Sequence, residues 1–73
     1  SNEKYVRFFL PLLSSVALTT LLVNNQAYRE YTLTHMSENL HIEKYQSVLR
    51  NLSTSGNKRL ASRVKHALRR AGQ

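Results

Sequence analysis

The sequence predicts an all-α fold, and three observations lead to this class. Apolar residues recur at spacings of three and four over most of the 73-residue chain, which is the period of an α-helix. No segment alternates apolar and polar residues cleanly enough to predict a strand. With only two glycines and one proline, few positions oppose helix formation. We therefore predict a single domain, residues 1–73, folded as a compact four-helix orthogonal bundle with a buried second helix and a basic C-terminal helix.

The first expected helix runs from Glu3 to Leu10. Pro11 must end or redirect it, because proline lacks the backbone N–H and suits the first turn of a following helix. The aromatic side chains are expected in the core or at its edge, and an exposed Phe8-Phe9 pair would instead indicate self-association. These aromatic residues are Tyr5, Phe8, Phe9, Tyr28, Tyr31 and Tyr45.

The second expected helix begins at Leu12 and is apolar on nearly all sides, which is typical of a central helix surrounded by others. The Asn24-Asn25 pair leaves open whether it continues. Tyr28 and Tyr31 recur at helical spacing, and neither glycine nor proline interrupts, so we expect continuation to about Thr34.

The uncharged run from Phe8 to Val23 also resembles a signal-peptide core or a short membrane segment. A spanning helix needs about 20 mostly apolar residues, whereas this run contains Pro11 and four Ser or Thr residues and is followed by Asn24 and Asn25. A helix buried in a bundle is therefore preferred, and a small membrane-associated helical protein stays an alternative.

Residues 34–37 are expected to connect to a third helix, with Ser37 as its N-cap and Glu38 in its first turn. The apolar residues of this helix, at offsets of three and four, are Ile42, Tyr45, Val48, Leu49 and Leu52. Turn-forming residues 53–57 follow, and the fourth helix extends from Lys58 to about Ala71. A helix-turn-helix motif around residues 53–57 is disfavoured, because a five-residue connection exceeds the usual three or four.

Composition argues against catalysis and against a cofactor or metal site. Without cysteine, disulfides and thiolate ligands are impossible. His35, His41 and His66 lack the spacing of metal ligands on one helix face, and the four glutamates are scattered. No glycine-rich phosphate loop or nucleophile motif occurs. We expect a protein that is not an enzyme.

Charge is the strongest functional signal. Residues 58–73 contain six of the eleven Lys and Arg residues and no acid, whereas the other 57 residues carry five bases and four acids. On a helical wheel, the apolar residues of this segment occupy one arc and its cations the other. We call these cations the basic face: Lys58, Arg59, Arg63, Lys65, Arg69 and Arg70. Such a helix can pack on a core and still present a cationic surface to a partner.

Three interpretations of the basic face remain. It captures an acidic protein segment or a nucleoprotein, because arginine pairs well with carboxylates. Alternatively, it contacts the phosphates of DNA or RNA, although it lacks the Asn or Gln that reads adenine and the aromatics that stack on bases. Third, it is a solvated surface that only maintains solubility. An intracellular location, cytoplasmic or nuclear, is expected, and the long apolar run leaves a homodimer open.

Viewed whole, the chain resembles the C-terminal nucleocapsid-binding domain of rhabdovirus phosphoproteins. The resemblance rests on the basic helix, the preceding Ser-rich turn and the small helical architecture. It implies a non-enzymatic adaptor that attaches a viral polymerase to nucleoprotein-coated RNA, with acidic loops of two neighbouring nucleoprotein subunits received by the basic face. Arg59, Arg63, Lys65, Arg69 and Arg70 would be the members of that patch.

Overall fold

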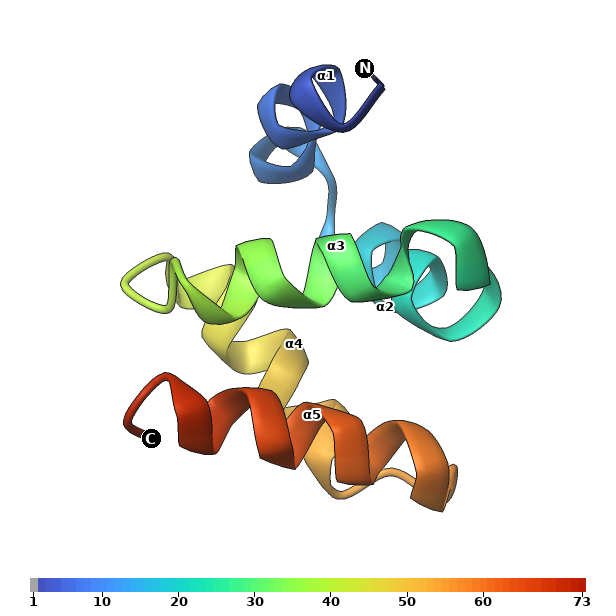
Figure 1. Ribbon diagram of the computed structural model, residues 1–73, viewed down its shortest axis with the longest axis vertical. Helices are drawn as coiled ribbons and strands as arrows, with labels where there is room; N and C mark the ends of the chain where they lie inside the picture. The colour runs from blue at the N-terminus through green and yellow to red at the C-terminus, as the bar shows by residue number, and fades with distance from the viewer. Residues whose placement is uncertain (1) are drawn as a thin grey trace.

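A computed structural model describes residues 2–73 of the protein; the side chains of residues 1–3, including that of Glu3, lie outside this description. The described chain forms α1 (Asn2–Phe9), the 3-10 helix η1 (Leu10–Leu12), α2 (Ser15–Asn24), α3 (Gln26–Ser37), α4 (Glu43–Ser53) and α5 (Lys58–Arg70), with no strand among these residues (Figure 1). The all-α class is confirmed. The expected four helices are replaced by five α-helices and one 3-10 helix.

The expected second helix is in fact two helices that meet at Asn25. Asn25 has extended backbone angles, φ −114° and ψ 90°, and serves as C-cap of α2 and N-cap of α3. Its side-chain Oδ1 accepts a hydrogen bond from the Tyr28 backbone N–H at 3.2 Å. Short polar side chains compete with the helical backbone in this way, so an asparagine can end one helix and begin the next without glycine or proline.

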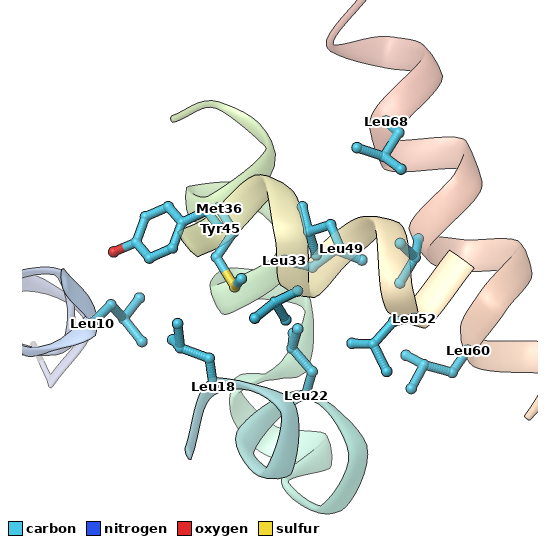
Figure 2. Close-up of a cluster of buried hydrophobic side chains, with 12 residues drawn as sticks. Leu10, Leu18, Leu22, Leu33, Met36, Tyr45, Leu49, Leu52, Leu60 and Leu68 are labelled. Carbon is cyan, nitrogen blue, oxygen red and sulfur yellow. The ribbon is translucent and has the colours of Figure 1, made fainter. Parts of the chain in front are cut away.

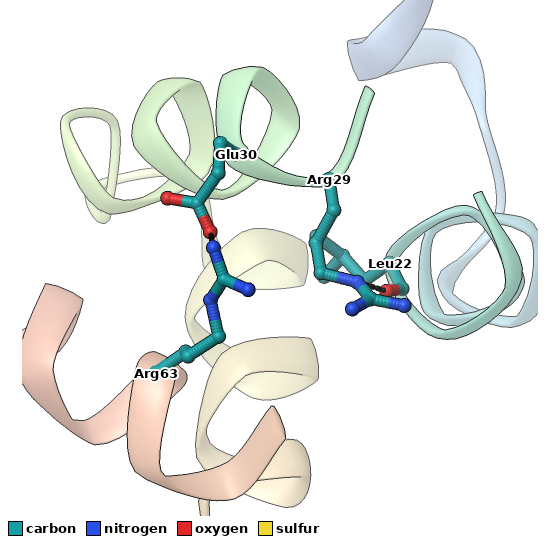
Figure 3. A network of polar contacts seen from close by, with 4 residues as sticks. All are labelled: Leu22, Arg29, Glu30 and Arg63. Carbon is teal, nitrogen blue, oxygen red and sulfur yellow. Dashed lines mark hydrogen bonds and ion pairs between the residues drawn. The ribbon is translucent and has the colours of Figure 1, made fainter. Parts of the chain in front are cut away.

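Arg29 stabilises the same junction from α3. Its guanidinium donates hydrogen bonds to the carbonyl oxygens of Leu22, at 2.7 Å, and Val23, at 2.8 Å (Figure 3 draws the Leu22 bond). The last carbonyls of an α-helix have no partner within the helix, so a cation at that end satisfies them and complements the helix dipole.

The boundaries on either side of the α3–α4 connection also differ from the sequence prediction. Residues 34–37 belong to α3, and Ser37 is not an N-cap: it is buried, and its hydroxyl donates to the Thr34 carbonyl at 3.1 Å. Glu38 is the C-cap of α3 rather than a first-turn residue of the next helix. Helix α4 starts only at Glu43, whose carboxylate lies in its first turn, where negative charge is favourable.

The centre of the fold is α4, not the expected second helix. Tyr45, Val48, Leu49 and Leu52 are buried, and α4 packs against α2, α3 and α5. In α2 only Leu18 and Leu22 are buried, whereas Val16 is 76% exposed. The buried apolar residues form one core cluster, with members from η1 and from α2 to α5 (Figure 2): Leu10, Leu18, Leu22, Leu33, Met36, Tyr45, Val48, Leu49, Leu52, Leu60, Val64 and Leu68. The amphipathic stripe of α4 was a better indicator of the centre than the uniform apolar character of α2, because a stripe commits one side to the interior.

The aromatic residues divide between the core and the surface. Tyr45 is fully buried, and Tyr28 and Tyr31 are half-buried, as expected for core and core-edge positions. The expectation is wrong for Tyr5, Phe8 and Phe9, which are all more than 60% exposed. The reason is that α1 stands at one end of the molecule, held mainly through η1, so only one side of it meets the body (Figure 1).

Candidate functional site

Helix α5 orients its two sides as the sequence predicted. Its apolar side is buried through Leu60, Ala61, Val64 and Leu68. All six residues of the basic face are exposed. The site is therefore a helix surface, fixed by burial of the opposite side.

Both ends of α5 are capped, which holds the basic face in one register. Asn57 accepts a hydrogen bond from the Leu60 backbone N–H at 3.2 Å through its side-chain Oδ1. At the other end Gly72 adopts φ 85°, a left-handed conformation that favours glycine. The N–H of Gly72 donates to the Arg69 carbonyl at 3.0 Å and that of Gln73 to the Leu68 carbonyl at 2.9 Å. This is the Schellman pattern, which satisfies the last carbonyls of a helix.

One edge of the basic face borders a groove of about 320 Å³ between α3 and α5. The groove combines cations with hydroxyl groups and a small apolar floor; among its lining residues are Leu33, Thr34, Ser37, Arg63, His66, Ala67 and Arg70. A ligand lying there would find positive charge from α5 and hydrogen-bonding groups from α3.

Arg63 forms an ion pair with Glu30 across this groove (Figure 3). The two side chains are 44% and 62% exposed, so the pair contributes at most about 1 kcal/mol to stability. It also neutralises one cation of the basic face, which the separation of charges along the sequence did not reveal. Among the described side chains this is the only salt bridge, so the other five cations of the basic face have no carboxylate partner there.

The other edge of the basic face borders α4. Lys65, Arg69 and Leu68 line a hollow there together with Arg50 and Ser53 of α4. The Arg50 guanidinium donates to Oε1 of Gln73 at 3.1 Å, which directs this cation toward the end of α5. Arg50 thus extends the basic face onto α4. The helical periodicity of the sequence predicts that Arg50 is exposed, but it does not indicate which neighbouring helix Arg50 lies beside.

Two cations outside α5 have backbone carbonyls as partners. Arg29 caps α2, as described above, and the Lys44 ammonium donates to the Pro11 carbonyl at 2.7 Å. Lys58 and Arg59 differ from these two cations, because they lie in the first turn of α5, where the helix dipole disfavours positive charge. Their charges are therefore not placed to stabilise their own helix.

The most perturbed titratable pair, His35 and Tyr45, lies away from the basic face. Nε2 of His35 is 3.2 Å from the Tyr45 hydroxyl, and the rings meet edge to face with centroids 5.4 Å apart. Burial, reinforced by the nearby Arg7 cation and opposed by Glu38, lowers the pKa of His35 below 6.5. Burial raises the pKa of the Tyr45 hydroxyl above 10.0. Both shifts favour neutral groups, which suits a packing contact between α3 and α4.

The described part of the chain offers neither a metal-ligand cluster nor a membrane span. No group of three or more His, Cys, Asp or Glu side chains there is arranged to hold a metal ion. None of the described helices has the length and apolar character needed to cross a bilayer.

No protein-family model, curated protein or solved structure matches the chain.

Proposed function

We propose that the protein is a non-catalytic docking module that binds a polyanionic partner through the basic face, and that this partner is an acidic segment of another protein. One observation carries the proposal: α5 exposes six cations, five of them without a carboxylate partner among the described side chains, while its other side is buried in the core. A surface of this kind attracts a negative partner and makes its association fast and salt-sensitive.

The groove between α3 and α5 supports a protein segment as the partner. Glu30 already places a carboxylate against Arg63 there, so the groove accepts that group. Arginine holds carboxylates through paired hydrogen bonds, and Arg70 and His66 lie along the same groove. The apolar floor from Leu33 and Ala67 provides a place for an aliphatic side chain between the acidic ones. An extended segment of alternating acidic and apolar residues fits this lining.

Within this class, we propose a nucleoprotein bound to RNA as the partner, in an adaptor role for a polymerase in an intracellular compartment. The support is the resemblance to the phosphoprotein domain described from the sequence, together with the exposure of Arg59, Arg63, Lys65, Arg69 and Arg70 on one helix. Acidic loops on a nucleoprotein would enter the groove at Arg63 and Arg70.

Direct binding of DNA or RNA is the second candidate, and the α4–α5 connection favours it. Because α4 includes Ser53, only the four residues 54–57 join the two helices, within the usual length of a helix-turn-helix connection. The predicted five-residue length of this connection, which counted against the motif, is therefore wrong. Helix α5 would occupy the recognition position, with Lys58, Arg59 and Ser62 exposed in its first turns. Arginine reads guanine, but no Asn or Gln lies within α5 to read adenine.

The deciding experiment compares two charge-reversal variants. Arg63→Glu with Arg70→Glu changes the groove, and the control Lys4→Glu with Arg7→Glu makes the same change in net charge at exposed positions of α1. The probe is a fluorescent peptide of alternating Glu and Leu, measured by anisotropy at about 150 mM salt. We expect the groove variant to lose at least about tenfold in affinity, because each lost charged hydrogen bond costs roughly 1.5–3 kcal/mol, whereas the control changes little.

Random-sequence RNA and duplex DNA are titrated in parallel. Tight duplex binding with a slope of log K against log[salt] near −5, about 0.9 per phosphate contact, and no peptide binding would favour the second candidate. Equal losses in both variants would show that only net charge matters, and no binding of any probe would reject the docking proposal. Circular dichroism and thermal unfolding establish that each variant is folded.

A further inference from the structure

A second surface, at the opposite end of the molecule from α5, is apolar and uncovered. It consists of side chains from α1 and η1 at the helical spacing i, i+3, i+4 and i+7, and we call it the apolar stripe: Tyr5, Phe8, Phe9 and Leu12. Phe8 is 69% exposed and Leu12 is 78% exposed. A run of large apolar side chains with this periodicity is normally the buried side of a helix.

The same segment already buries its other side on the body. Leu10 is only 1% exposed and belongs to the core cluster, and Val6 and Leu13 pack against that cluster (Figure 2 shows Leu10 entering the core from the end of α1). Helix α1 and η1 are thus apolar on two sides. A helix with two apolar sides is typical of one that lies between two packed bodies, and only one body is present in a single chain.

The attachment of this segment keeps the apolar stripe facing outward. Besides the burial of Leu10, the Lys44 ammonium of α4 donates a hydrogen bond to the Pro11 carbonyl at 2.7 Å. Turning Phe8 and Phe9 inward would withdraw Leu10 from the core, since residues one or two positions apart on a helix do not face the same side. The chain therefore has no low-cost way to cover the apolar stripe itself.

We propose that a second copy of this chain covers the apolar stripe, in a symmetric dimer with α1–η1 packed against α1–η1. A covered aromatic side chain buries about 150–250 Å², so three rings about two-thirds exposed offer on the order of 400 Å² per chain. Leu12 brings this to on the order of 500 Å². Two copies then bury on the order of 1,000 Å², about the smallest area expected of a biological interface.

The distribution of charge supports this occupant. No residue of the apolar stripe is charged, and the basic face lies at the other end of a molecule that is 29 Å long (Figure 1). Joining two copies through the apolar stripe therefore keeps the two basic faces apart, which limits their repulsion at physiological salt. An anionic membrane is a poorer fit, because only Lys4 and Arg7 of the described bases lie on α1, and α5 with its six cations lies at the opposite end of the molecule (Figure 1).

Dimerisation gives the chain two basic faces on one particle. A partner with repeated acidic segments would then bind both, and the second contact would form at a raised effective concentration. The dimer itself depends only on the apolar stripe, so it stands or falls independently of the proposed docking function.

The test measures the mass of the protein in solution. Sedimentation equilibrium from about 1 µM to 1 mM is expected to show a concentration-dependent rise from 8.4 kDa toward twice that mass. The variant Phe8→Glu with Leu12→Glu is expected to stay at the monomer mass. A control, Gln26→Glu with Ala27→Glu, introduces the same charge at exposed positions of α3 and is expected to dimerise like the natural sequence.

Three results would contradict the proposal. The first is a natural sequence that remains monomeric at 1 mM. The second is a Phe8→Glu, Leu12→Glu variant that still dimerises, which would place the interface elsewhere. The third is a natural sequence that stays monomeric and sediments with vesicles of phosphatidylserine and phosphatidylcholine, while the variant does not bind the vesicles. That result would assign the apolar stripe to a lipid surface. Circular dichroism of the variant excludes unfolding as the cause of a monomer mass, and a neutral variant, Phe8→Ser with Leu12→Ser, replaces it if the charged one unfolds.

Discussion

Helices α1 and α5 both carry apolar and basic residues, yet they expose opposite sides. Helix α5 buries Leu60, Val64 and Leu68 and turns its cations to solvent. Helix α1 buries only its Val6 side against the body and exposes Tyr5, Phe8 and Phe9. The comparison shows that an amphipathic pattern defines two sides of a helix but does not identify what covers each side.

The difference arises from how each helix is attached. Helix α5 packs against α4 and α3, and its apolar side is buried from Leu60 to Leu68. Helix α1 has its main contact with the 3-10 helix that follows it, and Leu10 and Pro11 connect it to the body. The two ends of the molecule therefore offer different chemistry: cations for a negative partner at α5 and uncovered apolar area at α1.

The largest expected effect tests which apolar residues hold the fold together. Leu60→Ala in α5 should lower the free energy of unfolding by about 2–5 kcal/mol, because it removes a buried side chain and leaves a cavity. Phe8→Ala in α1 removes a larger side chain, but at micromolar concentration it should change the free energy by less than about 0.5 kcal/mol because that ring is exposed. Urea unfolding of both variants measures the difference. Equal losses would mean that α1 is packed as tightly as α5.

The next effect concerns the single neutralised cation of the basic face. Glu30→Gln frees Arg63, so affinity for the acidic Glu-Leu peptide should rise by about two- to fivefold, a free-energy change within the range of an exposed ion pair. The control Glu43→Gln makes the same change in net charge on α4, away from the groove. Fluorescence anisotropy of the three proteins gives the comparison. If both variants gain equally, Arg63 is not part of the binding site.

The smallest effect tests whether α1 lies on the body in solution. Arg7 of α1 contributes to the lowered pKa of His35 in α3, second to burial. Arg7→Gln should therefore raise the pKa of His35, followed by NMR titration of its ring protons. A pKa unchanged by this variant would mean that Arg7 is not close to His35. Lys4→Gln, an exposed change on the same helix, is the control.

The same pKa predicts how stability depends on pH. Because the folded state lowers the pKa of His35 below 6.5, the unfolded chain binds more protons between these two values. The contribution of His35 is fully present above pH 6.5 and is lost as the pH falls through that window. His35→Gln should flatten this part of the stability profile, measured by urea unfolding at several pH values.

The basic helix could be predicted in detail because its amphipathic pattern and its capping residues indicate the same boundaries and the same buried side. Cations and apolar residues separate cleanly along Lys58–Arg70, Asn57 is a good N-cap, and Gly72 suits the end of a helix. Where local helix preference and amphipathic pattern favour the same structure, tertiary packing does not change it. The length and orientation of α5 both followed from the sequence for this reason.

The Asn25 junction could not be predicted with the same certainty. Asparagine is tolerated within helices and favoured at caps, so the pair Asn24-Asn25 fits one long helix or two short ones. The carbonyls that Arg29 satisfies are available only when α3 turns back beside α2. A contact between residues six or seven positions apart across a bend is not visible in helical periodicity.

The sequence by itself determined the helical class, the register of α5 and the concentration of positive charge at the carboxyl-terminal end, because periodicity, capping and charge are local properties of the chain. Only the tertiary structure decided that α4 rather than α2 is the centre, that Glu30 reaches Arg63, and that Phe8 and Phe9 face outward. Each of these depends on where two distant segments meet, and the hydrophobic effect rewards burial of apolar area without specifying which apolar side is buried.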